Sequence, residues 1–214
     1  MKNKNTKSFW NKKIISEQNN LFNSPIYLDK NKIILKYLQN AEGKLLNIGV
    51  GYGYIEQMLN IKLPNLKLYG IDISDVSIKL AKVKSKGKFL KANALKIPFK
   101  DQKFDYVLAL DIIEHFKLGE LELFFDQLNK KIKKGGKFIV SVPLNESKKD
   151  RMANRHEVSF TDTKLIGILT KNDFLIQRHK LLYAFERHYF IKSFFAKYLK
   201  FIKPNLFIVE AIKK

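Results

Sequence analysis

Short apolar runs alternate with amphipathic segments along most of this 214-residue chain. The apolar runs predict strands, and the segments between them have apolar positions at the three- and four-residue spacing of helices. Such alternation is typical of βαβ units, which build a parallel sheet with right-handed crossovers. We therefore expect an α/β fold with a doubly wound, mostly parallel sheet. The predicted strands are residues 44–48, 66–71, 88–91, 105–110, 137–142, 174–181 and 206–212.

Helices are predicted between these strands by the same periodicity. Ser74 is a suitable N-cap for the segment that follows it. The pair Gly135-Gly136 is expected to stop the helix that precedes it. The predicted helices are residues 33–38, 54–60, 75–86, 118–132, 164–171 and 186–203.

A glycine ladder follows the first predicted strand, with Gly49, Gly51 and Gly53 at every second position. Glycine permits positive φ and lets the backbone approach a ligand closely, because it has no Cβ. Asp72 ends the next predicted strand, 19 residues after the last glycine. This layout of strand, glycine turn, helix, strand and acid is typical of a nucleoside site in which the acid accepts hydrogen bonds from ribose hydroxyls.

The ladder differs from the motifs that bind phosphate groups. A dinucleotide fingerprint needs a small residue where this chain has Tyr54, and no Gly-Lys-Ser/Thr follows to form a P-loop. A ribose acid without dedicated phosphate chemistry suits S-adenosylmethionine.

Five segments in this order resemble the class I S-adenosylmethionine-dependent methyltransferases, in the type 11 group that includes ubiquinone-biosynthesis enzymes. One position departs from the pattern: Asn47 stands where the family usually has an acid, and it lacks the charge that would attract the cofactor's ammonium group. The matching segments are Leu46–Gly53, Tyr69–Ile73, Lys91–Phe99, Phe104–Phe116 and Lys134–Pro143.

The resemblance implies a Rossmann-like sheet of seven strands whose last strand is antiparallel, and S-adenosyl-L-methionine as cofactor. Asp72 would hold the ribose, Ile73 would pack on adenine, and Asn93 would bond the adenine edge, where Ala94 leaves room for the ring. The methionine end would lie against Asp111 and against the amides that open residues 54–60. The implied cofactor residues are Asn47, Gly49, Gly51, Gly53, Tyr54, Asp72, Ile73, Asn93, Ala94, Asp111 and Ile112.

Histidines are the candidates for a general base, because their pKa lies near neutrality. His115 and His156 fall in loops expected on the cofactor side of the sheet, and we predict them as catalytic residues. His179 falls in a predicted strand and His188 near the start of the last helix, so neither is expected to act.

The leading hypothesis is methyl transfer to a small molecule, at oxygen. Quinone precursors, lipid-like phenols and sugar-linked metabolites are candidate acceptors. The Asp111-Ile-Ile-Glu segment lacks the Asn/Asp-Pro-Pro-Tyr pattern of enzymes that methylate base amino groups, which argues against that chemistry.

The net charge of +21 motivates RNA methylation as an alternative. However, 37 of the 41 basic residues are Lys and only four are Arg, and they are spread along the chain. A second alternative is a partner subunit that keeps the cofactor fold without activity. Asn47 is its only support. The oligomeric state is left open.

Cysteine is absent, which excludes disulfides, thiolate metal sites and cysteine-dependent methylation. No metal site is predicted. No apolar run resembles a signal peptide or a membrane span, so we expect a cytoplasmic protein. A single domain is expected, with an N-terminal helical cap (1–40), a cofactor-binding core (41–182) and a final helix and strand (183–214).

The two ends of the chain have apolar residues outside the family motifs. Trp10, Phe22 and Tyr27 are candidates for contact with the substrate. The segment 186–203 combines aromatic residues on one helical face with lysines around it. We expect this face to pack on the sheet, and peripheral contact with a membrane is the alternative.

Overall fold

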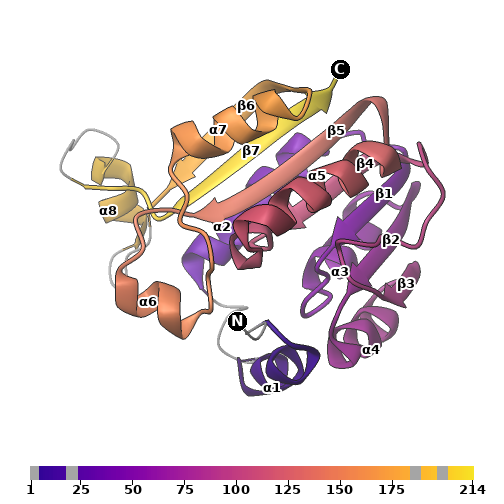
Figure 1. Cartoon of the computed structure of the whole chain (residues 1–214), viewed down its shortest axis with the longest axis horizontal. Coiled ribbons are helices and arrows are strands. Elements are labelled where there is room, and N and C mark those ends of the chain that lie inside the picture. Colours follow the sequence, from indigo (N-terminus) through magenta and orange to yellow (C-terminus); the bar gives the residue numbers. More distant parts are fainter. Residues whose placement is uncertain (1–4, 18–23, 184–188, 197–201) are drawn as a thin grey trace.

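The computed structural model describes residues 5–17, 24–183, 189–196 and 202–214. Seven strands form one sheet in the order β3-β2-β1-β4-β5-β7-β6 (Figure 1). The pairs from β3 to β5 are parallel, whereas β7 is antiparallel to both β5 and β6. This is the predicted doubly wound, mostly parallel sheet. The strands are β1 (Gly43–Ile48), β2 (Leu66–Asp72), β3 (Lys88–Lys91), β4 (Phe104–Leu110), β5 (Ile132–Pro143), β6 (Phe174–Leu182) and β7 (Leu206–Lys213).

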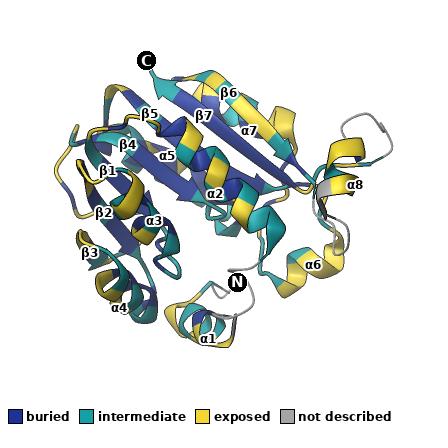
Figure 2. Cartoon of the chain, turned by 180° about the vertical axis from the view of Figure 1, so that it is seen from behind, coloured by how far each residue is buried: buried dark blue, intermediate teal, exposed yellow. Residues whose placement is uncertain are grey.

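Helices cover both faces of the sheet (Figures 1 and 2). The apolar side chains of α5 (Leu118–Lys131) and α7 (Asp162–Lys171) belong to one core. Those of α2 (Pro25–Tyr37), α3 (Tyr54–Lys62) and α4 (Asp75–Lys84) belong to the other. Three further elements lie outside these layers: α1 (Lys7–Glu17), α6 (Lys148–Ala153) and α8 (Tyr189–Ala196). A short 3-10 helix, η1 (Ile113–His115), follows β4.

Successive side chains of β4 contribute to the two cores in turn. Val107 and Ala109 point to the α5 side, whereas Leu108 belongs to the α2 side, and all three are completely buried. Successive side chains of a strand point to opposite faces, so a strand covered on both faces is apolar throughout.

The predicted elements are confirmed apart from three differences. The helix expected over 33–38 begins at Pro25, which suits the first turn because proline has no N–H to lose there. The helix α6 was not predicted, and α1 falls in the predicted N-terminal helical cap although no separate helix was given there. Gly135-Gly136 does not stop a helix: α5 ends at Lys131, and β5 already pairs with β4 at Ile132, before the two glycines.

The prediction that the aromatic face of 186–203 packs on the sheet is wrong for the residues described there. Ile191, Phe194 and Phe195 of α8 are each more than half exposed, and Ala196 is buried. Figure 1 shows α8 beyond the ends of β6 and β7, away from the two faces of the sheet. Residues 186–188 and 197–201 of the predicted helix lie outside the described part. Among the residues the structure describes, no helix is long and apolar enough to cross a membrane.

Candidate functional site

A cavity of about 670 Å³ opens at the carboxyl ends of β1, β2 and β4. This is the edge at which ligands bind in open α/β sheets. The two predicted histidines and all but two of the predicted cofactor residues line it: Asn47, Gly49, Gly51, Asp72, Ile73, Asn93, Ala94, Asp111, Ile112, His115 and His156.

The two exceptions are Gly53 and Tyr54, which do not line the cavity. Gly53 has φ of +72°, and a Cβ there would lie 2.8 Å from Cα of Ala81, so it allows α3 and α4 to pack closely. The ring of Tyr54 lies under Lys84, with Nζ 3.3 Å from its centroid. Both residues therefore contribute to the packing of α3 against α4.

The glycine turn exposes backbone to the cavity at Gly51. Its φ is +55°, and an added Cβ would meet nothing within 4 Å, which leaves open space for a ligand against the main chain. Gly49 has a different reason to be glycine, because a Cβ there would lie 2.1 Å from Cδ1 of Ile112. The turn thus supplies both close packing and an accessible backbone.

Asp72 is oriented by the turn that it faces. Its carboxylate accepts hydrogen bonds from the backbone N–H of Gly51 (3.0 Å) and of Ser74 (2.8 Å). Burial raises the pKa of Asp72 to about 6 although these hydrogen bonds favour the charged form. A carboxylate held in this way can accept further hydrogen bonds from ribose hydroxyls, so the residues present fit the nucleoside of S-adenosylmethionine.

Asn47 contacts a carboxylate that the sequence analysis missed. Its Nδ2 lies 2.6 Å from Oε1 of Glu56, which is completely buried on α3. Burial raises the pKa of Glu56 to about 7. Neither Oδ1 of Asn47 nor Oε2 of Glu56 has a hydrogen-bond partner among the described residues. A carboxyl group thus lies behind Asn47, which itself lines the cavity, whereas Glu56 does not.

Asp111 directly follows β4 and has a left-handed backbone conformation, with φ of +55°. It pairs with Lys30 of α2 at 2.5 Å and accepts a hydrogen bond from Oγ of Ser141 at 2.6 Å. Burial opposes its charge, but Lys30 and Ser141 hold the pKa of Asp111 below its ordinary value. This ion pair connects α2 to the edge of the cavity. No local pattern could have indicated Lys30, which is 81 positions away.

Asn93 makes an Asx turn, in which its Oδ1 accepts from the backbone N–H of Leu95 at 2.9 Å. Trp10 and Tyr27 line the cavity as expected for substrate contacts, and Phe22 lies outside the described residues.

His115 and His156 come together although 41 positions separate them. Their ring centroids are 4.7 Å apart, and Trp10 packs edge-on against His115. Burial, and then the neighbouring His156, lower the pKa of His115 to about 3, so its ring is neutral at physiological pH. His179 packs near Phe207 on β6 and does not line the cavity, and His188 lies outside the described part of the chain.

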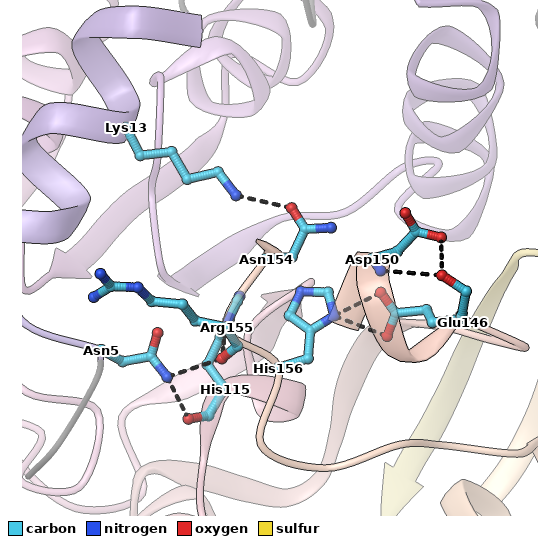
Figure 3. Close-up of polar contacts among 9 residues, drawn as sticks. Asn5, Lys13, His115, Glu146, Asp150, Asn154, Arg155 and His156 are labelled. Carbon is cyan, nitrogen blue, oxygen red and sulfur yellow. Dashed lines mark hydrogen bonds and ion pairs between the residues drawn. The ribbon is translucent and has the colours of Figure 1, made fainter. Parts of the chain in front are cut away.

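Further polar groups position this pair (Figure 3). Nδ1 of His156 lies 2.7 Å from Oε1 of Glu146. The side chain of Asn5 donates to the backbone oxygens of His115 and Arg155, at 3.0 and 3.1 Å. The sequence analysis did not identify Glu146 or Asn5, because each meets the histidines only through tertiary contacts.

Glu114 is the third ionisable group at this end of the cavity. It is completely buried in η1, and burial, followed by the charge of Asp111, raises its pKa well above the ordinary value. Its position next to His115 places a carboxyl group beside both imidazoles.

Comparison with known proteins agrees with this site. Residues 46–140 match a family model described as a methyltransferase domain, of type 11. An uncharacterised protein of Methanocaldococcus jannaschii is 28% identical over 195 residues, which cover 90% of this chain and 77% of the relative.

Two solved structures share the fold. Phosphoethanolamine N-methyltransferase 2 of Haemonchus contortus, in complex with phosphomonomethylethanolamine and S-adenosylhomocysteine, has a TM-score of 0.72 at 20% identity and covers 95% of this chain and 57% of that one. The N-methyltransferase NodS of Bradyrhizobium japonicum, with S-adenosylhomocysteine, has a TM-score of 0.72 at 15% identity and covers 95% and 98%. The family match over residues 46–140, the shared fold and the geometry of the site make this chain similar to the class I S-adenosylmethionine-dependent methyltransferases of the type 11 group.

Proposed function

We propose that this methyltransferase transfers the methyl group to a hydroxyl oxygen of a small-molecule acceptor. The observation that supports this best is the pair of imidazoles, His115 and His156, facing each other 4.7 Å apart at one end of the cofactor cavity. An amine acceptor is nucleophilic in its neutral form, whereas a hydroxyl reacts better once its proton is removed or polarised. The neutral imidazole of His115, with the ring of His156 and a buried carboxyl group beside it, suits the hydroxyl.

The cofactor is assigned to the opposite end of the cavity. Asp72 holds the ribose, with Ile73 and Ala94 beside the adenine, and Asn47 with Glu56 receives the ammonium group. S-adenosylmethionine supplies an electrophilic methyl group when bound. The protein must then align the acceptor oxygen with the bond from sulfur to that methyl group, at about 3–3.5 Å.

Activation of the acceptor hydroxyl is assigned to the histidine pair. The hydrogen bond from Nδ1 of His156 to Glu146 favours the tautomer whose Nε2 lone pair is available. His115 has a pKa of about 3, so it accepts a proton poorly. Its ring stays neutral and offers only a nitrogen lone pair to the acceptor hydroxyl. The two rings therefore have different tasks in the same site.

A small acceptor is favoured over RNA by the cover on the cavity. Trp10, Lys13 and Ile14 of α1 line it from outside the sheet, together with Ile26 and Tyr27 near the start of α2. These aromatic and aliphatic groups suit a partly apolar molecule such as a quinone precursor or a lipid-like phenol. RNA methylation remains the rival, supported by the charge of +21.

Contact with a lipid surface would bring such an acceptor to the enzyme, and α8 is the element we assign to it. Ile191, Phe194 and Phe195 are exposed there with Lys192 beside them. Aromatic residues mixed with lysine suit the interface of an anionic membrane, and each basic residue near that surface is worth about 1 kcal/mol.

The test is methylation of cell extract by the full chain with methyl-labelled S-adenosylmethionine, followed by separation into lipid, small-molecule and RNA pools. Label is expected in the lipid or small-molecule pool, and mass spectrometry of the product should place the methyl group on oxygen. The Asp72→Ala variant is the control, because it should bind the cofactor poorly. Label that accumulates in RNA, with an association that weakens steeply with salt, would support the rival.

A further inference from the structure

We propose that Glu114, His115 and His156 bind a divalent transition-metal ion that holds and acidifies the acceptor hydroxyl. The three residues offer one carboxylate oxygen and two imidazole nitrogens that all lie within 4.8 Å of one another. This inference deepens the function proposed above and rests on it for the role of the ion in the reaction. An ion held by both imidazoles would then activate the hydroxyl in place of the free lone pairs of the two rings. Binding of the ion stands on the geometry alone.

The two imidazoles are oriented as metal ligands usually are. Nδ1 of His156 lies 2.7 Å from Oε1 of Glu146, and Nδ1 of His115 lies 3.4 Å from the backbone oxygen of Arg155. Metal-binding histidines typically donate one ring N–H to a carboxylate or carbonyl, which leaves the other nitrogen to the metal. Each ring here has one nitrogen next to such an oxygen, so Nε2 is the ligand atom in both.

Glu114 supplies an independent reason for a cation. Its side chain is 1% exposed, and Oε2 has no hydrogen-bond partner among the described residues. A buried carboxyl oxygen without a partner is costly, and a metal ion would satisfy it. Among the nearby acids, Asp111 is already paired with Lys30, so Glu114 and Glu146 supply the negative charge for the ion.

The neighbouring cations are directed to other partners. Nζ of Lys13 donates to Oδ1 of Asn154 at 3.1 Å. The guanidinium of Arg155 lies over the ring of Phe9, 3.6 Å from its centroid. Figure 3 shows both groups near the histidines.

Two nitrogens and one oxygen form a donor set suited to zinc, manganese, iron(II) or cobalt, which leaves coordination positions open. All three ligand residues line the cavity, so those positions face the space assigned to the acceptor. An acceptor with two adjacent oxygens, such as vicinal hydroxyls or a hydroxyl next to a carbonyl, would fill them as a chelate.

The reaction balances without a further reagent. The bound hydroxyl releases its proton to solvent, and the oxygen forms a bond to the methyl carbon. The bond from that carbon to sulfur breaks with its electron pair going to sulfur. The products are the methyl ether, neutral S-adenosylhomocysteine and one proton.

The test is titration of the chelator-treated full chain with Mn²⁺, with free Mn²⁺ measured by electron paramagnetic resonance. One ion per chain is expected. Glu114→Gln and His156→Ala should each weaken its binding at least tenfold, and Glu146→Gln about 10- to 100-fold. His179→Ala is the matched control, because His179 is exposed on β6 and lies outside the cavity. Retained binding of S-adenosylmethionine would show that each variant is folded.

Absence of saturable Mn²⁺, Co²⁺ and Zn²⁺ binding, or equal weakening in His179→Ala, would overturn the site. Unchanged O-methylation by the chelator-treated enzyme would overturn the role of the ion and leave the proposed function intact. Saturable Mn²⁺ binding at these ligands together with methylation at nitrogen would instead support the site and refute the proposed function.

Discussion

Replacing Glu56 by Gln should stabilise the protein at alkaline pH while weakening its hold on the cofactor. Glu56 is completely buried, with one oxygen bonded to Asn47 and the other without a partner among the described residues. Burial raises its pKa from 4.5 to about 7. Glutamine has nearly the same shape and can accept the same hydrogen bond, but it carries no charge.

The expected size follows from that pKa. Below pH 4.5 Glu56 is protonated in both the folded and the unfolded chain, so its ionisation costs no stability. Between pH 4.5 and 7 only the unfolded chain releases the proton, and the free energy of unfolding falls. Above pH 7 the loss reaches about 3 kcal/mol, because each pKa unit is worth about 1.36 kcal/mol. Burying the new amide N–H groups adds a pH-independent cost of about 1–3 kcal/mol.

The assay is urea unfolding of both proteins at pH 5, 6, 7 and 8. The free energy of unfolding of Glu56→Gln, relative to the natural chain, should rise by about 2.5 kcal/mol across this range, because part of the loss has already occurred at pH 5. Glu122→Gln is the control, since Glu122 is exposed on α5 and should give a flat difference. Calorimetry at pH 8 should show weaker binding of S-adenosylmethionine to Glu56→Gln, whose charge near the ammonium group is gone. Parallel stability curves at all four pH values would refute the buried, perturbed carboxyl group.

Three further outcomes are expected. Asp72→Ala should weaken S-adenosylmethionine binding by about 1.5–3 kcal/mol in calorimetry, as expected for hydrogen bonds to a charged group, and unchanged affinity would place the ribose elsewhere. Gly51→Val should abolish cofactor binding and lower the melting temperature through backbone strain alone, because φ there is +55° while its Cβ meets open space. Gly53→Val should unfold the chain, because it adds to that strain a Cβ only 2.8 Å from the backbone of α4. Changing both Phe194 and Phe195 to Ser should alter stability by less than about 1 kcal/mol, because both are more than half exposed, and should reduce flotation with anionic vesicles. A large fall in melting temperature would show that this face is buried in solution.

The sequence predicted the sheet, and it named residues that the fold brings to one cavity, for a local reason. Strand and helix periods follow from backbone geometry, so they are visible in consecutive residues. Gly49, Gly51 and Asp72 belong to one strand–turn–helix–strand unit, in which chain connectivity alone brings them together. Even here one detail failed, since the prediction for Gly53 did not include the close packing of α3 on α4.

The other end of the site was decided by contacts between distant segments. Asn47 suggested a missing charge, and only the tertiary structure shows that its side chain is bonded to the carboxyl group of Glu56. Glu114 and His156 are far apart in sequence, so no spacing could indicate that they share a ligand site.

The exposure of the apolar face of α8 was likewise decided by the tertiary structure. Its periodicity indicates a helix with an apolar face, but whether that face is covered depends on what else occupies the sheet. Because α8 lies outside both cores, Phe194 and Phe195 are at the surface. The sequence by itself determined the elements and the glycine turn, since backbone geometry is local. The tertiary structure alone decided which charges are paired and which apolar faces are buried, because burial depends on every segment that competes for the same surface.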